Sequence, residues 1–136
     1  MKRKNLLMTL IMSVVMLTAV ILAGCGGGVK VGSFSSLYFN SDEFQEAVNE
    51  LLTYFKSFEG CTLTEINYAG DDAVRAEAEA RGLPNELVMV MESTFTTDGE
   101  NHENGLEPNF TYENYRWIFT RDFVGGPWSH ADHGYG

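Results

Sequence analysis

This chain of 136 residues contains little of what catalytic or nucleic-acid-binding proteins usually display. It has only 2 cysteines, 3 histidines and 3 prolines, and 19 aspartates and glutamates outnumber its 9 lysines and arginines. An acidic surface repels nucleic acid and anionic lipid headgroups. The sequence has no nucleophile elbow, phosphate-binding loop or dinucleotide fingerprint. We therefore predict a protein that is not an enzyme, binds no nucleic acid and needs no cofactor.

The N-terminus has the pattern of a secretory signal. Lys2, Arg3 and Lys4 precede the run Leu6–Leu22, which is almost wholly apolar. A short apolar run behind basic residues is typical of a signal peptide. An uncleaved transmembrane anchor is the alternative, because the apolar stretch approaches the roughly 20 residues that cross a bilayer. Both interpretations place the rest of the chain on the outer side of the membrane.

The end of this run, Leu22-Ala23-Gly24-Cys25, resembles the lipobox of bacterial lipoprotein precursors. The resemblance implies a thioether-linked lipid on Cys25 and cleavage between Gly24 and Cys25. Glycine and serine then dominate up to residue 36, which is typical of a flexible tether. We therefore predict a lipoprotein signal peptide over residues 1–24, a lipidated tether over residues 25–36 and a small extracytoplasmic domain over residues 37–136. The lipid on Cys25 would hold this domain on the extracytoplasmic face of the cell membrane.

Cleavage would also change the charge of the protein. Three basic residues lie in the signal and all 19 acidic residues follow residue 40, so the net charge would change from −10 to −13. Such a domain attracts cationic peptides or divalent cations. A well-solvated surface accounts for the same charge without a partner, and both explanations stay open. With Cys25 acylated, Cys61 has no disulfide partner, and we expect it to be a small, buried apolar residue.

The middle of the chain predicts an amphipathic helix followed by a strand and a weaker helix. Asn40-Ser41-Asp42-Glu43 offers a helix N-cap with early negative charge. Apolar residues then recur at three- and four-residue spacing before Gly60, namely Phe44, Ala47, Val48, Leu51, Leu52, Phe55 and Phe58. A strand is expected over residues 62–68 and the second helix over residues 71–81.

The apolar period changes to two after Glu86, which predicts strands. One face of the first strand carries Leu87, Met89, Met91, Ser93 and Phe95, and one face of a long aromatic strand over residues 112–124 carries Tyr115, Trp117, Phe119 and Phe123. Gly125-Gly126-Pro127 predicts a turn before a last strand over residues 128–133. The predicted fold class is α+β, with the N-terminal amphipathic helix packed on a curved antiparallel sheet of about four strands.

Three stretches of the C-terminal half resemble the ending of an uncharacterised family of small lipoproteins from Gram-positive bacteria. They are Tyr115-Arg116-Trp117-Ile118-Phe119-Thr120-Arg121, Gly126-Pro127-Trp128 and Asp132-His133-Gly134-Tyr135-Gly136. The Phe-Glu-Gly-Cys-Thr-Leu run at residues 58–63 also fits, so the likeness covers roughly the last 95 residues. The resemblance implies a cystatin-like or nuclear-transport-factor-2-like fold, in which a curved sheet grips a helix.

Two clusters contain metal-ligating residue types, but neither predicts a metal site. His130, Asp132 and His133 are types that bind zinc. On a regular strand, however, His133 would face away from the other two. The acidic loop over residues 98–108 lacks the ligand spacing and the mid-loop glycine of a calcium-binding EF-hand. We expect a solvated hairpin loop there.

Glu92 and Arg116 are the strongest candidates for a binding site. Each lies in an apolar strand on the face opposite the expected aromatic core, so adjacent antiparallel strands would place them side by side. A cross-strand ion pair is the simplest interpretation, and it contributes about 0.2 to 1 kcal/mol. The functional alternative is a candidate binding surface in which this pair and Tyr68, Trp128 and Tyr135 hold a small polar group.

Two functions of different class remain. The first is a non-catalytic binding or interaction domain that uses its sheet surface to engage another envelope protein or a peptide, since the aromatic residues exceed what one small core easily hides. The second is a small-molecule-binding or hydrolytic domain with a pocket between helix and sheet, which only the family resemblance and the Glu92–Arg116 pair support. Sheets of the implied fold also pair through their open face, so a homodimer is a third expectation for partners.

Overall fold

The computed structural model describes the backbone of residues 20–22 and 28–135 and the side chains of residues 28–135. The expected cleavage site at Gly24 and Cys25 lies outside these residues. Within the described part of the chain, no helix is long and apolar enough to cross a membrane. The elements in chain order are β1 (Val20–Leu22), β2 (Val29–Val31), α2 (Ser41–Phe55), β3 (Cys61–Tyr68), α3 (Asp71–Arg81), the short 3-10 helix η1 (Asn85–Leu87), β4 (Val88–Thr97), β5 (Thr111–Thr120) and β6 (Ser129–Gly134).

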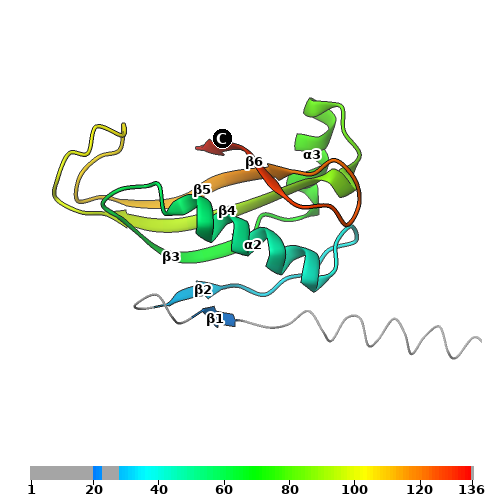
Figure 1. The fold of residues 1–136 in the computed structure, drawn as a ribbon, viewed down its shortest axis with the longest axis horizontal. Coiled ribbons are helices and arrows are strands. Elements are labelled where there is room, and N and C mark those ends of the chain that lie inside the picture. Colours follow the sequence, from blue (N-terminus) through cyan, green and yellow to red (C-terminus); the bar gives the residue numbers. More distant parts are fainter. Residues whose placement is uncertain (1–19, 23–27, 136) are drawn as a thin grey trace, which may run out of the picture.

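The strands form one open sheet in the order of the sequence (Figure 1). Strands β2 to β6 make up a five-stranded mixed sheet, and β1 adds three residues at the β2 edge. Strands β2 and β3 are parallel, whereas all other neighbours are antiparallel. The predicted α+β class is confirmed. The prediction of a wholly antiparallel sheet of about four strands is wrong, because β2 enters the sheet in the parallel direction.

Strand β2 also corrects the predicted tether, which ran to residue 36. Val29 and Val31 are buried, and Val31 lies opposite Ile66 of β3. Phe34 is buried as well and stacks on Phe44 of α2, with ring centroids 4.6 Å apart. The folded domain therefore includes residues 29–36. Strand β1 falls within the segment that we expect to be removed as a signal peptide, so its pairing with β2 describes the uncleaved chain.

Helix α2 begins where the sequence predicts it. The Asn40 side chain accepts a hydrogen bond from the Glu43 backbone N–H, and the Glu43 carboxylate accepts one from the Asn40 backbone N–H, each 2.8 Å long. This capping box satisfies two donors that a helix start would otherwise leave unpaired. The helix buries one stripe of residues, which consists of Phe44, Ala47, Val48, Leu51 and Phe55.

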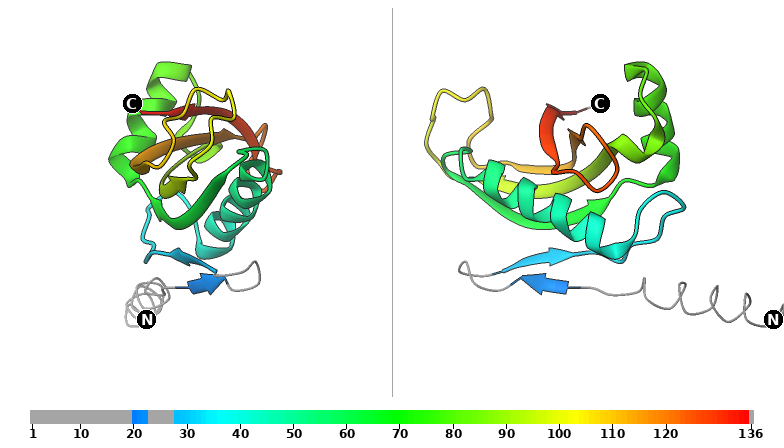
Figure 2. Two further views of the ribbon diagram at one scale, coloured as in Figure 1. Left: turned by 90° about the vertical axis from the view of Figure 1, so that its left-hand side faces the viewer. Right: turned by 45° about the vertical axis from the view of Figure 1, so that its right-hand side comes forward.

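The two helices lie on opposite sides of the sheet (Figure 2). Helix α2 packs on the face that carries Met89, Met91, Phe95, Trp117 and Phe119, all fully buried. Helix α3 covers only one end of the other face, where Val88 and Val90 are also fully buried. Phe123 was expected in the core but is 60% exposed, because β5 ends at Thr120 and the chain turns away. No described element covers the part of the second face beyond α3.

Candidate functional site

The open part of the sheet carries a row of polar side chains across four strands. We call this row the polar face; it consists of Lys30, Glu65, Asn67, Glu92 and Arg116. Cross-strand register places them on one side of the sheet, since Lys30 lies opposite Glu65, Asn67 opposite Glu92, and Glu92 opposite Arg116. The Asn67 amide donates a hydrogen bond of 3.0 Å to the Glu65 carboxylate.

Glu92 and Arg116 lie side by side at the centre of the polar face. The Arg116 Nη2 donates to the Glu92 Oε2 over 3.2 Å, and the two side chains are 31% and 29% exposed. An ion pair that still contacts water to this degree contributes little to folding, about 0.2 to 1 kcal/mol. Its charges are thus held in place and remain accessible from solvent.

A shallow pocket of about 420 Å³ opens beside this ion pair, and we call it the sheet pocket. It is lined by Glu92, Glu113, Asn114, Arg116 and Tyr135. Asn114 has a φ of 57°, and the β4–β5 register shifts opposite it, between Ser93 and Phe95. A β-bulge of this kind bends the strand and redirects side chains, which is how Glu113 and Asn114 come to line the pocket.

Tyr135 completes the pocket from the end of β6. Its ring is 59% exposed, and its centroid lies 5.7 Å from that of Tyr112 and 5.6 Å from that of Tyr115. Gly134, with a φ of 138°, lies opposite Arg116 and lets the chain turn here. Tyr135 therefore borders the pocket at the edge of the sheet, while its ring lies against Tyr112 and Tyr115 on the α2 side.

The other two aromatic residues proposed for this surface lie elsewhere. Tyr68 lies two residues after Ile66 in β3, so its side chain is on the same α2 side of the sheet. Its hydroxyl donates to Asp71 Oδ1 over 2.5 Å. Burial and the bond to Asp71 raise the pKa of the Tyr68 phenol. Trp128 is buried, and its indole N–H donates to the Glu43 carbonyl over 3.2 Å. Tyr68 and Trp128 therefore do not share a surface with Glu92 and Arg116, because both pack on the α2 side of the sheet.

The interface between α2 and the sheet is filled by aromatic side chains. Phe55 contacts Phe95 and Trp117 edge to face, with centroids 5.3 and 6.0 Å apart. The Trp117 indole N–H donates to Ser93 Oγ over 2.8 Å, so the buried polar atom is satisfied. Among the described residues, these side chains fill the centre of the interface, and a pocket of about 400 Å³ lies at its margin, between α2 and Gly125–Trp128.

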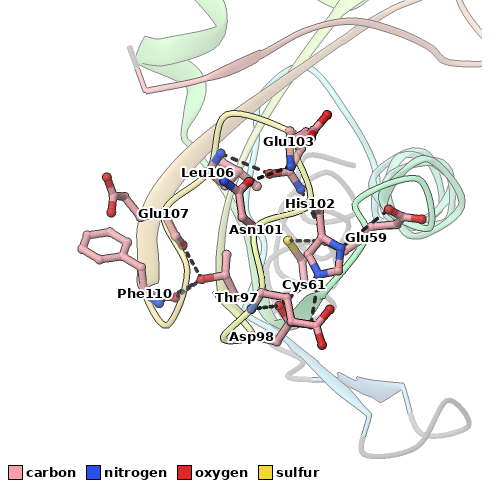
Figure 3. A network of polar contacts seen from close by, with 12 residues as sticks. Glu59, Cys61, Thr97, Asp98, Asn101, His102, Glu103, Leu106, Glu107 and Phe110 are labelled. Carbon is pink, nitrogen blue, oxygen red and sulfur yellow. Dashed lines mark hydrogen bonds and ion pairs between the residues drawn. The ribbon is translucent and has the colours of Figure 1, made fainter.

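The acidic loop between β4 and β5 folds back on the turn after α2 (Figure 3). His102 Nε2 lies 3.0 Å from Asp98 Oδ1, and His102 Nδ1 lies 3.7 Å from Glu59 Oε1. The Asp98 carboxylate raises the pKa of His102; the Glu100 backbone N–H, and after it His102, lower the pKa of Asp98. We call the contact among Glu59, Asp98 and His102 the loop clamp. The loop is largely exposed, as expected of a solvated hairpin loop, and the loop clamp ties it to the turn after α2.

Cys61 lies next to the loop clamp and is partly buried. Burial, and after it the Asp98 carboxylate, raise the pKa of the Cys61 thiol. A thiol with a raised pKa stays protonated and is a poor nucleophile. The described residues contain no group of three or more histidine, cysteine, aspartate or glutamate side chains that converge on a metal position.

The histidines of β6 are arranged differently from the prediction. The β5–β6 register shifts between Ile118 and Phe119, which leaves Ala131 as an extra residue. His130 and His133 therefore both face the α2 side, and His130 Nε2 is hydrogen-bonded to His133 Nδ1 over 2.9 Å. Burial, and after it His133, lower the pKa of His130. The expectation that these two histidines face opposite sides was wrong, because it assumed a regular strand.

Two pocket residues, Glu113 and Asn114, were not among the predicted site residues. The only sequence signal for them is an asparagine within a predicted strand, because asparagine is one of the few residues that tolerate a positive φ at a bulge. One such residue is too weak a signal to predict a bulge. Comparison with known proteins found no matching family model, no matching curated protein and no matching solved structure.

Proposed function

We propose that this protein is a non-catalytic binding domain, held on the outer face of the cell membrane by a lipid on Cys25, whose polar face takes a basic segment of another envelope protein or a peptide. The resemblance to small Gram-positive lipoproteins belongs to the same proposal. The observation that carries it is the sheet pocket, which Glu92, Glu113, Arg116 and Tyr135 line beyond the end of the face that α3 covers.

The charge of the site favours a cationic ligand. Two carboxylates and one guanidinium line the sheet pocket, and the whole chain carries a net charge of −10. A protonated amine would be attracted by the overall field and by Glu92 and Glu113. Arg116 remains available to a backbone carbonyl of the same ligand.

The residues of the sheet pocket suit binding rather than covalent chemistry. Arg116 offers hydrogen-bond donors and no acceptor, and the Asn114 amide offers both. Glu92 is already paired with Arg116, so its carboxylate serves as a fixed acceptor. Together they provide fixed donors and acceptors around a space of about 420 Å³, which accommodates one or two side chains of a peptide.

The test is an NMR titration of the full chain in detergent micelles, with a tri-lysine peptide as the probe and tri-glutamate as its control. Tri-lysine is expected to shift the backbone signals of Glu92, Glu113, Arg116 and Tyr135, and the shifts should weaken as salt rises. Glu92→Gln and Glu113→Gln should each weaken binding roughly fivefold, which corresponds to about 1 kcal/mol. Glu46→Gln, on the opposite side of the sheet, should leave binding unchanged.

Equal shifts with tri-glutamate, or an equal loss in the Glu46→Gln variant, would show that the polar face is not a cation site. The membrane part of the proposal is tested separately by feeding cells an alkyne fatty acid. Labelling should be present in the native chain and absent after Cys25→Ser. Unlabelled native protein would overturn the lipid anchor and leave the binding site untouched.

A further inference from the structure

The histidine pair of β6 has a geometry that the polar face does not use. His130 and His133 face the α2 side of the sheet, whereas the sheet pocket is on the other side. Asp132 points away from the pair, since it lies opposite Ile118 and its Oδ2 is 3.9 Å from Arg81 Nη2 of α3. The two imidazoles thus form an independent cluster.

Aromatic neighbours hold both imidazole rings in place. The His130 ring stacks on Tyr54 of α2, with centroids 3.9 Å apart and planes 8° from parallel. The His133 ring lies 5.2 Å from Trp117 and 5.4 Å from Phe58. The His133 backbone N–H donates to the Asp132 carboxylate over 2.8 Å, which fixes the backbone between the two rings. Rings held in this way lose little freedom when they bind a ligand.

The two ring nitrogens are close enough to bind one metal ion once each ring turns its lone pair from the hydrogen-bond axis toward a shared metal position. His130 Nε2 and His133 Nδ1 are 2.9 Å apart. Imidazole nitrogens bind late transition metals at about 2.0 to 2.1 Å. With the two nitrogens 2.9 Å apart, the N–metal–N angle would be about 90°. This angle is that of neighbouring ligands in a square-planar or tetragonal site, which Cu²⁺ and Ni²⁺ prefer. A tetrahedral zinc site would need the nitrogens to be about 3.3 Å apart.

We propose that His130 and His133 form a two-histidine site for a divalent late transition metal, with Cu²⁺ bound most tightly. Cu²⁺ leads the affinity order of the first-row divalent metals at imidazole ligands. On binding, the hydrogen that now bridges the two nitrogens moves to the other nitrogen of the ring that carries it, so both bridging nitrogens offer a lone pair. The described residues supply no third protein ligand at this position, and water molecules fill the other coordination positions. The site is therefore open and its metal exchangeable.

Trp117 provides a direct readout. Its indole ring lies 5.2 Å from His133 and 6.3 Å from His130, and it is fully buried. A paramagnetic Cu²⁺ ion between the histidines would quench its fluorescence. The experiment is a titration of the full chain in detergent micelles with CuCl₂, followed by tryptophan fluorescence, with equilibrium dialysis to count bound copper.

The expected result is one Cu²⁺ per chain and a saturable fall in fluorescence. His130→Gln and His133→Gln should each weaken binding at least about tenfold. The matched control is His102→Gln, which removes the third histidine of the chain and should leave the affinity unchanged. Unchanged affinity in the His130 and His133 variants, or an equal loss in the His102 variant, would overturn the proposal.

A second measurement on the native chain needs no variant. Histidine side-chain NMR should show Cu²⁺ broadening the ring signals of His130 and His133 before those of His102. Zn²⁺ should shift the same two sets of signals only at higher concentration, because its preferred angle requires the rings to separate. Broadening that reaches all three histidines together would show adventitious surface binding and overturn the site.

Discussion

Replacing Glu43 by glutamine should destabilise the domain more than any other single carboxylate change on α2. The Arg121 side chain is fully excluded from solvent, and its Nη2 donates to Glu43 Oε2 over 2.8 Å. Its Nε donates to the Glu86 carbonyl over 3.0 Å, and its guanidinium lies 4.2 Å from the centroid of Trp128. Glu43 is the carboxylate that balances this buried charge.

The expected magnitude follows from the burial of the pair. Removing one partner of a buried ion pair costs about 3 to 5 kcal/mol, because the other charge is left uncompensated. Because Glu43 is 18% exposed, we expect the free energy of unfolding to fall by about 3 kcal/mol, at the lower end of this range. Glutamine can still accept the capping-box hydrogen bond from the Asn40 backbone N–H, so the loss reports on charge. For a domain of this size it lowers the Tm by roughly 12 to 24 °C.

The assay is urea and thermal unfolding of the full chain in detergent micelles, followed by tryptophan fluorescence. Glu46→Gln is the control, because this residue is exposed on the same helix and should change stability by no more than about 0.5 kcal/mol. Arg121→Met should cost less than Glu43→Gln, since the carboxylate that it leaves behind reaches solvent. If Glu43→Gln matches the Glu46 control, or if Arg121→Met is the more damaging change, the buried-charge reasoning is refuted.

Three further predictions concern the glycines at two turns, the loop clamp and the N-cap of α2. Gly60 and Gly82 have φ values of 73° and 69°, but only at Gly60 would a Cβ meet His102 Nε2, at 2.3 Å. Gly82→Ala should lower the free energy of unfolding in urea by about 1 to 2 kcal/mol, and Gly60→Ala should lower it further. Adding His102→Ala to Gly60→Ala should remove most of this extra loss, with Asp98 Oδ2, at 2.8 Å from the new Cβ, accounting for the rest. An equal loss at Gly60 and Gly82 would contradict the contact. The loop clamp should be pH-dependent: the raised pKa of His102 gives stabilisation that is complete below its ordinary value near 6.5 and lost as pH rises through the raised value. The lowered pKa of Asp98 gives stabilisation that is present above its ordinary value of 3.8 and lost as pH falls through the lowered value. Hydrogen exchange of the loop should therefore be slowest between the ordinary pKa values of Asp98 and His102. An exchange rate that does not change with the stability of the loop across this pH range would count against the loop clamp. Asn40→Ala should cost about 1 kcal/mol of unfolding free energy, with faster exchange confined to the start of α2; uniform acceleration would argue against a local cap.

Features set by neighbours along the chain could be predicted from the sequence. The N-cap at Asn40 and the apolar stripe of α2 depend only on spacing within one helix. The pairing of Glu92 with Arg116 followed from the alternation in two long strands joined by one loop. The helix and the strand of Glu92 therefore lie where the sequence predicts them, whereas the strand of Arg116 ends at Thr120, before the predicted residue 124.

Features that depend on an irregular strand could not be predicted. The bulges at Asn114 and Ala131 each add a residue and reverse the facing of everything beyond them. They place Tyr112 and Tyr115 on the same face and bring His130 to His133. A count of alternating residues assumes that no bulge occurs, so it assigned Tyr115 correctly and His133 incorrectly.

The amino-acid sequence by itself determined the α+β class, the position of α2 and the acidic character of the domain, because each is a local or additive property of the chain. Only the tertiary structure decided that Val29–Val31 joins the sheet, that Trp128 closes the core over Arg121, and that Tyr135 lines the same pocket as Glu92. These contacts join residues far apart in the sequence. Their register depends on how the whole sheet packs against α2, and no local pattern carries that information.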